Sequence, residues 1–258
     1  MGCIARTASG RTKLVDFMNA HTTGSHEENV RNLRHDLMVA ALGHVPFEGW
    51  SDKCVSSAAE DLGIDLRTAL EIVPGGARDI AAEFHLWGDR KMERQLLRQD
   101  FSQTRYSERI AEAVWLRMSL VGEHQLVVRR STALFSLPNN SILGGRLLWG
   151  TADLIWNALG DTSTDGNWYT KRATLSAVVG STVMYWIGDS SEGFVATREF
   201  VDRRIANVMR FEQFKSRVRE SRALRPVTDR MAGVMERMSR PAASRNEYPG
   251  WKGRTARD

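Results

Sequence analysis

The stretch LLWGTADLIWNALGDTSTDGNWYTKRATLSAVVGSTVMYWI, residues 147–187, contains two apolar runs joined by a polar segment. Apolar residues recur at helical spacing in both runs, 147–159 and 173–187, and this pattern predicts two amphipathic helices. Gly160 can end the first helix, and Thr164 or Asp165 can cap the second. The stretch therefore predicts a pair of helices joined by a short connection.

The connecting segment contains residues that a simple loop between two helices does not require. Asn167, Trp168, Tyr169 and Arg172 are of types suited to contacts between proteins, where Trp, Tyr and Arg are enriched. A second interpretation stays open, because Trp168 is in register with the apolar face of the following run and fits a core tryptophan. Arg172 likewise fits an ion-pair partner inside the domain.

The segment DTSTDGNWYTKRA, residues 161–173, resembles the signature of the ubiquinone-biosynthesis accessory proteins of the Coq-nine type. The resemblance extends over roughly residues 27–209, with further similar segments in the same order: LRMSL (116–120), LP (137–138), ADLIW (152–156) and DSSEGF (189–194). It implies an all-α fold like that of TetR regulators, lipid binding, no cofactor and a homodimer.

In that family the matching segment lies at the surface that engages the carboxylate-bridged di-iron hydroxylase acting on demethoxyubiquinone. By residue-for-residue match, the resemblance assigns partner binding to Asp165, Asn167, Trp168, Tyr169 and Arg172. A flavin hydroxylase of the same pathway stays open as the partner.

The rest of the chain also indicates an all-α protein, with about ten helices in total. Apolar residues make up 42 % of the chain, only 6 residues are proline, and no alternating strand pattern is sustained. We expect helices over 27–42, 51–62, 66–73, 77–99, 107–121, 125–137, 141–159, 167–187, 193–217 and 226–240. These divide into a disordered or targeting segment (1–26), a helix-turn-helix-like head (27–75), a lipid-binding body (76–217), an amphipathic helix (226–240) and a disordered basic tail (241–258).

The charge of the head argues against DNA binding. Residues 51–73, which hold the two helices that would approach a duplex, contain two basic and five acidic residues. Because lysine and arginine supply most non-specific affinity for DNA, a net charge of −3 predicts repulsion. We therefore expect no nucleic-acid partner, while a ligand-responsive TetR-like repressor remains the alternative function.

The body is rich in large apolar side chains, which fit either an ordinary core or a pocket for a long isoprenoid or acyl chain. The resemblance favours the pocket, whose ligand would be an isoprenoid quinone precursor or a phospholipid. The candidate lipid-binding residues are Trp115, Met118, Phe135, Leu143, Leu147, Trp149, Val183 and Met184.

The terminal helix 226–240 carries one apolar stripe of valine and methionine, with arginines beside it. Such a helix can lie in the headgroup region of an anionic membrane, where each nearby arginine contributes about 1 kcal/mol. Docking onto the body or onto a dimer partner is the alternative. The candidate membrane-contact residues are Val227, Met231, Val234, Met235, Met238, Arg230 and Arg237.

The net charge is unevenly spread. Residues 201–258 carry 15 basic and 7 acidic residues, whereas the first 200 carry a net charge of −3. This distribution fits attachment to an anionic surface. We expect a bacterial cytoplasmic protein at the periphery of the inner membrane, with the matrix side of the mitochondrial inner membrane as the alternative. No catalytic or metal-binding motif is recognisable, so we expect no enzymatic activity.

Overall fold

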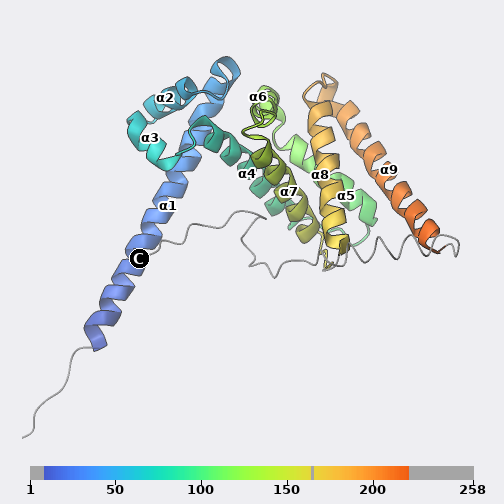
Figure 1. Cartoon of the computed structure of the whole chain (residues 1–258), viewed down its shortest axis with the longest axis horizontal. Coiled ribbons are helices and arrows are strands. Elements are labelled where there is room, and N and C mark those ends of the chain that lie inside the picture. The colour runs from blue at the N-terminus through green and yellow to red at the C-terminus, as the bar shows by residue number, and fades with distance from the viewer. Residues whose placement is uncertain (1–8, 164–165, 221–258) are drawn as a thin grey trace, which may run out of the picture. The chain divides into compact units, whose positions relative to one another are not determined.

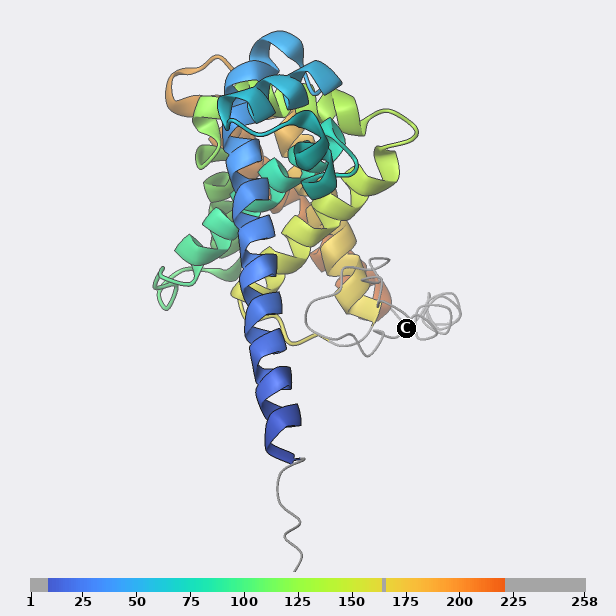
Figure 2. The same cartoon turned by 90° about the vertical axis from the view of Figure 1, so that its left-hand side faces the viewer.

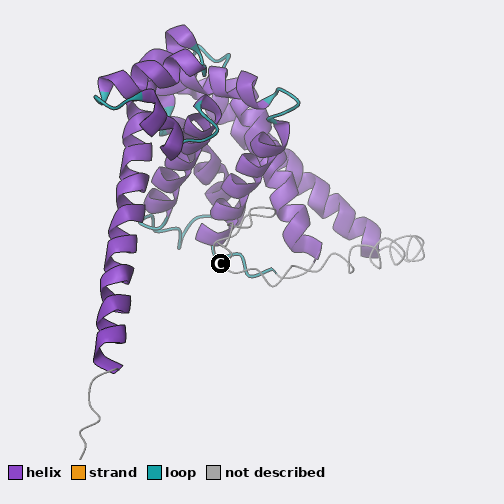
Figure 3. Cartoon of the chain, turned by 60° about the vertical axis from the view of Figure 1, so that its left-hand side comes forward, coloured by secondary structure: helices purple, strands orange, loops and turns teal. Residues whose placement is uncertain are grey.

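The computed structural model describes residues 9–163 and 166–220, and every regular element in these ranges is a helix (Figure 3). The prediction of an all-α chain is confirmed. The predicted segments 226–240 and 241–258 lie outside the described residues. The helices, labelled in Figure 1, are α1 (Ser9–Glu48), α2 (Asp52–Asp61), α3 (Leu66–Ile72), α4 (Ala77–Leu96), α5 (Tyr106–Ser119), α6 (Gln125–Phe135), α7 (Ser141–Ala158), α8 (Gly166–Trp186) and α9 (Val195–Glu220), with 3-10 turns η1 (Gly122–His124) and η2 (Glu192–Phe194).

The chain forms two compact units, Met1–Phe84 and His85–Asp258. In the first unit, α1, α2 and α3 contact one another as a helix-turn-helix-like head. The Ser51 side chain accepts from the Cys54 amide at the start of α2, and the Asp65 side chain accepts from the Thr68 amide at the start of α3. Both side chains thus cap the helices that the sequence predicts over 51–62 and 66–73. Gly63 joins α2 to α3 with a φ of +66°, which favours glycine.

Helix α1 differs from the prediction at both ends. It begins at Ser9 and runs to Glu48 as a single element (Figure 2), whereas the sequence predicts a helix over residues 27–42 and a turn at 44–51. The prediction takes Pro46 as a turn signal, but Pro46 lies in the last turn of the helix. Pro46 has no amide hydrogen to donate to the carbonyl four residues earlier, and the helix ends two residues later. The boundary between the two units, after Phe84, lies inside α4.

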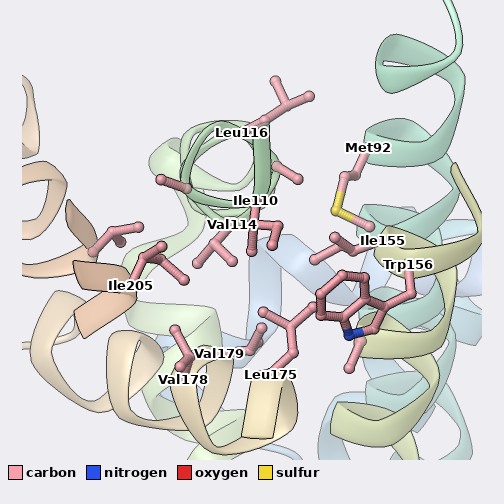
Figure 4. Packing of buried hydrophobic residues seen from close by; sticks show 14 of the residues in the cluster. Met92, Ile110, Val114, Leu116, Ile155, Trp156, Leu175, Val178, Val179 and Ile205 are labelled. Carbon is pink, nitrogen blue, oxygen red and sulfur yellow. The ribbon is translucent and has the colours of Figure 1, made fainter. Parts of the chain in front are cut away.

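The second unit is a bundle whose core is drawn from α4, α5, α7, α8 and α9 (Figure 4). Each helix contributes the apolar side chains of one face, which fits the amphipathic periodicity of its sequence. The buried cluster contains Met92, Leu96, Ile110, Ala111, Ala113, Val114, Leu116, Ala152, Ile155, Trp156, Leu175, Val178, Val179, Val201 and Ile205.

Two close approaches fix the helices around the candidate site. A Cβ at Gly144 on α7 would lie 2.9 Å from Phe135 Cβ on α6, so this close contact requires glycine. A Cβ at Gly180 on α8 would lie 3.4 Å from Leu148 Cδ1 on α7. Helices α7 and α8 are therefore packed side by side along their shared length.

Candidate functional site

The α7–α8 connection begins with a glycine-terminated helix end. Gly160 has a φ of +79°, and its amide donates to the Asn157 carbonyl over 3.1 Å. The Asp161 amide then donates to the Trp156 carbonyl over 2.9 Å, which completes a glycine-type helix end. The predicted stop signal at Gly160 is confirmed. The predicted caps Thr164 and Asp165 lie outside the described residues.

A charge network anchors this connection to both helices. Lys171 Nζ donates to Asp161 Oδ1 over 2.7 Å, and Arg172 Nη1 donates to Asp161 Oδ2 over 3.1 Å. Arg172 also reaches across to α7, where it donates to the Asp153 carboxylate and to the Asn157 side-chain oxygen. The Arg172 side chain is fully buried, and the Asp161 side chain is 3 % exposed. Neighbouring cations on α8 thus hold the two oxygens of one carboxylate.

The pKa of Asp161 reflects this network. Burial alone raises the pKa of a carboxyl group, because it disfavours the charged form. Hydrogen bonds from Lys171, Ser163 and Arg172 outweigh burial and lower the pKa of Asp161 to about 2. Asp161 is therefore ionised at neutral pH, and its charge compensates the two cations.

Three aromatic side chains pack beside the network. Trp168 and Tyr169 meet edge to face with ring centroids 4.7 Å apart, and the Trp149 ring lies 5.9 Å from Trp168 and 6.2 Å from Tyr169. The Arg172 guanidinium lies 4.1 Å from the centroid of the Trp168 ring, a cation–π distance. Trp149 comes from the predicted lipid-binding set and the other two rings from the predicted partner-binding set, so the structure joins the two sets in one cluster.

The five predicted partner-binding residues are placed differently. Asn167 is exposed and Tyr169 is half-buried, so both offer atoms at the surface. Trp168 and Arg172 are buried, at 6 % and 0 % exposure, which agrees with the core tryptophan and internal ion pair that the sequence left open. Asp165 lies outside the described residues. The surface formed by Asn167 and Tyr169 is therefore backed by Trp168 and Arg172.

The predicted lipid-binding residues differ in exposure. Met118 and Leu147 are buried, and Met184 is 59 % exposed. The other five are half-buried: Trp115, Phe135, Leu143, Trp149 and Val183. None of the eight belongs to the core cluster of the second unit, which includes Trp156 and Leu175 instead. Apolar periodicity identifies a helical face, but it does not say which part of that face meets which neighbour.

A second polar network, missed by the sequence analysis, links α4, α5 and α7. Arg117 Nε donates to Asp89 Oδ1 over 2.7 Å, and Thr151 Oγ1 donates to Asp89 Oδ2 over 2.9 Å. His85 Nε2 lies 2.9 Å from Thr151 Oγ1. Burial lowers the pKa of His85, Arg117 lowers it further, and Asp89 opposes both. The partners are 28 or more residues apart in sequence, so no local pattern predicts them.

The α7–α8 hairpin lies in the part of the chain that matches a known protein family. Residues 143–212, which cover most of α7, all of α8 and much of α9, match the family model described as COQ9. This part of the chain is therefore similar to the COQ9 family. The aromatic cluster and the Asp161 network both lie within it, and the predicted resemblance is confirmed.

Relatives named COQ9 align with most of this chain. The chain is 28 % identical over 188 residues to the human ubiquinone biosynthesis protein COQ9, mitochondrial, covering 70 % of this chain and 59 % of the human protein. It is 26 % identical over 204 residues to the corresponding Schizosaccharomyces pombe protein, covering 76 % of this chain and 80 % of that protein. The chain thus spans less than two thirds of the human relative. Both relatives are named as mitochondrial, which matches the alternative predicted location and gives no support to a bacterial one.

The fold of the chain also resembles a solved structure. A TetR transcriptional regulator from Nitrosomonas europaea superposes with a TM-score of 0.56 at 17 % sequence identity. The match covers 68 % of this chain and 97 % of that chain. At this identity the likeness concerns the fold, and the predicted TetR-like architecture is confirmed.

Helices long and apolar enough to cross a membrane are absent from the part of the chain that the structure describes. The predicted membrane-contact helix, residues 226–240, lies outside that part, so its role stays a prediction.

Proposed function

We propose that this chain is a non-catalytic accessory protein of ubiquinone biosynthesis that binds polyprenylated quinone precursors and presents them to a ring hydroxylase. The match of residues 143–212 to the COQ9 family carries the proposal. That match covers the α7–α8 hairpin, where the candidate lipid-binding residue Trp149 contacts the candidate partner-binding residues Trp168 and Tyr169.

A carrier is physically useful in such a pathway. Each exposed CH₂ of a polyprenyl chain costs about 0.8 kcal/mol in water, so the precursor leaves a bilayer only when a protein covers the chain. We propose that the arginine- and methionine-rich segment 226–240 brings the protein to the membrane surface. The half-buried body residues Trp115, Phe135 and Val183 are candidates for covering the chain.

The partner surface of the proposal centres on Asn167 and Tyr169. Both are accessible, and the buried residues behind them fix the start of α8 through the ion pairs of Arg172. A prearranged surface loses less conformational entropy on binding than a mobile one. The proposed partner is the di-iron hydroxylase that acts on demethoxyubiquinone, and the proposed assembly contains a homodimer of this chain.

Lipid extraction and affinity capture test the proposal together. Purified full-length protein is expected to carry an isoprenoid quinone or its precursor, detected by mass spectrometry of the organic extract. Tagged hydroxylase is expected to retain the wild-type chain, while Tyr169→Asp is retained at least about tenfold less, because a buried contact site loses 2 kcal/mol or more when disrupted.

The control is Tyr185→Asp, a change of the same type at an exposed tyrosine on the same helix. If both variants bind like the wild type, the partner surface is wrong. If the wild type carries no lipid and is not retained, the accessory function itself is wrong.

A DNA-binding repressor is the second candidate, favoured by the likeness to a TetR regulator. The surface of the helix-turn-helix-like head argues against DNA binding. Helix α3 exposes Leu66 and Leu70 beside a single arginine, and residues 51–73 carry a net charge of −3. We expect no salt-dependent retention of duplex DNA in a gel-shift assay at low salt. Salt-dependent retention there would favour the repressor.

A further inference from the structure

Two polar atoms in the last two turns of α8 are buried and lack a hydrogen-bond partner among the described residues. They are Thr182 Oγ1 and Trp186 Nε1, and both side chains are completely buried. Buried hydroxyls in helices commonly donate to the carbonyl four residues earlier, as Ser176 does to Arg172. No such bond is made by Thr182. A buried polar atom gives up its bond to water, so an unpaired one calls for an explanation.

The two atoms lie on the face of α8 that points into the second unit. Leu175, Val179, Thr182 and Trp186 follow at steps of 4, 3 and 4, which places them in one stripe of the helix. All four are buried. Thr182 and Trp186 are thus one turn apart in an interior stripe whose preceding members are apolar, so the neighbouring side chains of the stripe offer no partner.

The end of this stripe is closed by a strained residue. Phe194 has a φ of +56°, a left-handed conformation that is unfavourable for a residue with a side chain. In this conformation its ring packs on Trp186, with the ring centroids 5.5 Å apart. Gln125 Nε2 donates to the Trp186 carbonyl over 2.7 Å and fixes the helix end. Contacts to the ring and to the backbone carbonyl therefore hold Trp186 in place.

The chemistry of the two groups limits what can bind them. An indole N–H only donates, so the occupant must offer an acceptor, and the threonine hydroxyl can donate to the same atom or accept from it. An ionised occupant is disfavoured, because an unpaired charge is costly in an apolar interior. The fitting group is a neutral oxygen of a carbonyl or hydroxyl.

We propose that Thr182 and Trp186 form a polar subsite that receives one carbonyl or hydroxyl oxygen of an otherwise apolar ligand inside the second unit. The subsite rests on the proposed lipid binding and names the ligand group that α8 recognises. A single trapped water offers the same oxygen chemistry, and the experiment separates the two sources.

The test compares two probes that share a tail and differ in ring oxygens, decylubiquinone and decylbenzene. Each is titrated into the full-length protein in the same detergent, and bound fractions are read by native mass spectrometry. The wild type is expected to prefer decylubiquinone. Thr182→Val removes one hydroxyl at little change in shape, and Trp186→Phe removes the indole N–H together with one ring. Each is expected to weaken decylubiquinone binding roughly 2- to 12-fold, the contribution of one neutral hydrogen bond. Binding of decylbenzene should not change.

Ser181→Ala is the matched control, because the Ser181 hydroxyl is adjacent in sequence but donates to the Val178 carbonyl. It should bind both probes like the wild type. If Thr182→Val and Trp186→Phe both keep the preference, the two groups hold only water and the subsite is wrong. If circular dichroism shows that one variant does not fold, the other variant alone tests the subsite.

The wild type separates this proposal from the proposed function. Equal binding of the two probes overturns the subsite and leaves lipid binding intact. Binding of neither probe overturns both.

Discussion

Arg117 on α5 and Asp89 on α4 form an ion pair that is almost completely enclosed, with Nε 2.7 Å from Oδ1 and both side chains at most 6 % exposed. Thr151 from α7 donates to the same carboxylate, so three helices meet at one charge. Two buried charges are tolerated only when each compensates the other and their remaining hydrogen-bonding atoms are satisfied.

Removal of one charged side chain of this ion pair should therefore destabilise the protein strongly. We expect Arg117→Met to lower the free energy of unfolding by about 3–5 kcal/mol, because Asp89 is left as a buried uncompensated charge. Urea denaturation followed by circular dichroism measures this. The control is Arg203→Ala, which breaks an exposed pair with Glu199 and should cost less than about 1 kcal/mol. A loss below about 1 kcal/mol for Arg117→Met would show that the pair contributes little.

Gly88 makes room for the same arginine. A Cβ at Gly88 would lie 2.7 Å from the Arg117 guanidinium carbon, so Gly88→Ala must displace the ion pair. We expect it to destabilise the protein, although alanine is favoured over glycine by about 1 kcal/mol in a helix. Gly43→Ala on α1, where nothing lies within 4 Å of the new carbon, should stabilise by up to about 1 kcal/mol. Melting temperatures that shift in the same direction for both variants would contradict this reading.

The stability of the α7–α8 hairpin should depend on pH in the acid range. The pKa of Asp161 is about 2 in the folded chain, and its ordinary value is 3.8. Because the folded pKa is the lower one, this contribution is fully present above pH 5 and is lost as the pH falls from there toward 2. The shift corresponds to about 2 kcal/mol. Unfolding free energies measured at pH 5 and pH 3 should fall less in Asp161→Asn than in the wild type, and parallel profiles would disprove the assignment.

Substitutions at Trp168 and Asn167 should affect stability differently, because the first side chain is buried and the second is exposed. Trp168→Ala removes a buried ring that stacks on Arg172, and we expect a cost of about 3–5 kcal/mol. Asn167→Ala changes an exposed side chain and should alter stability by less than about 0.5 kcal/mol. Thermal unfolding distinguishes them. A Trp168 variant that is as stable as the wild type would place this ring at the surface rather than in the core.

Local signals in the sequence predict the helices of this protein well. The caps Ser51 and Asp65 and the terminating Gly160 lie where their side-chain and backbone chemistry predicts. Pro46 misleads, because a proline in the last turn of a helix looks the same in sequence as a proline in a turn.

The site is predicted only in part. The segment 161–172 is identified from its composition and its resemblance, but its side chains divide between surface and interior according to contacts made across helices. Arg172 meets Asp153 nineteen residues away, and Arg117 meets Asp89 twenty-eight residues away. Such pairings follow from how helices pack, and periodicity within one helix does not specify them.

The shared carboxylate of Asp161 limits which of these positions can change during evolution. One aspartate pairs with both Lys171 and Arg172, so a neutral residue at position 161 removes the carboxylate from Lys171 and leaves Arg172 with Asp153 alone, in a single mutational step. Lys171 can change first at little cost, because it keeps contact with solvent, whereas Arg172 cannot. Homologues are therefore expected to vary at 171 while keeping 161 and 172 as a pair, and any sequence that has lost one of the pair should have lost the other.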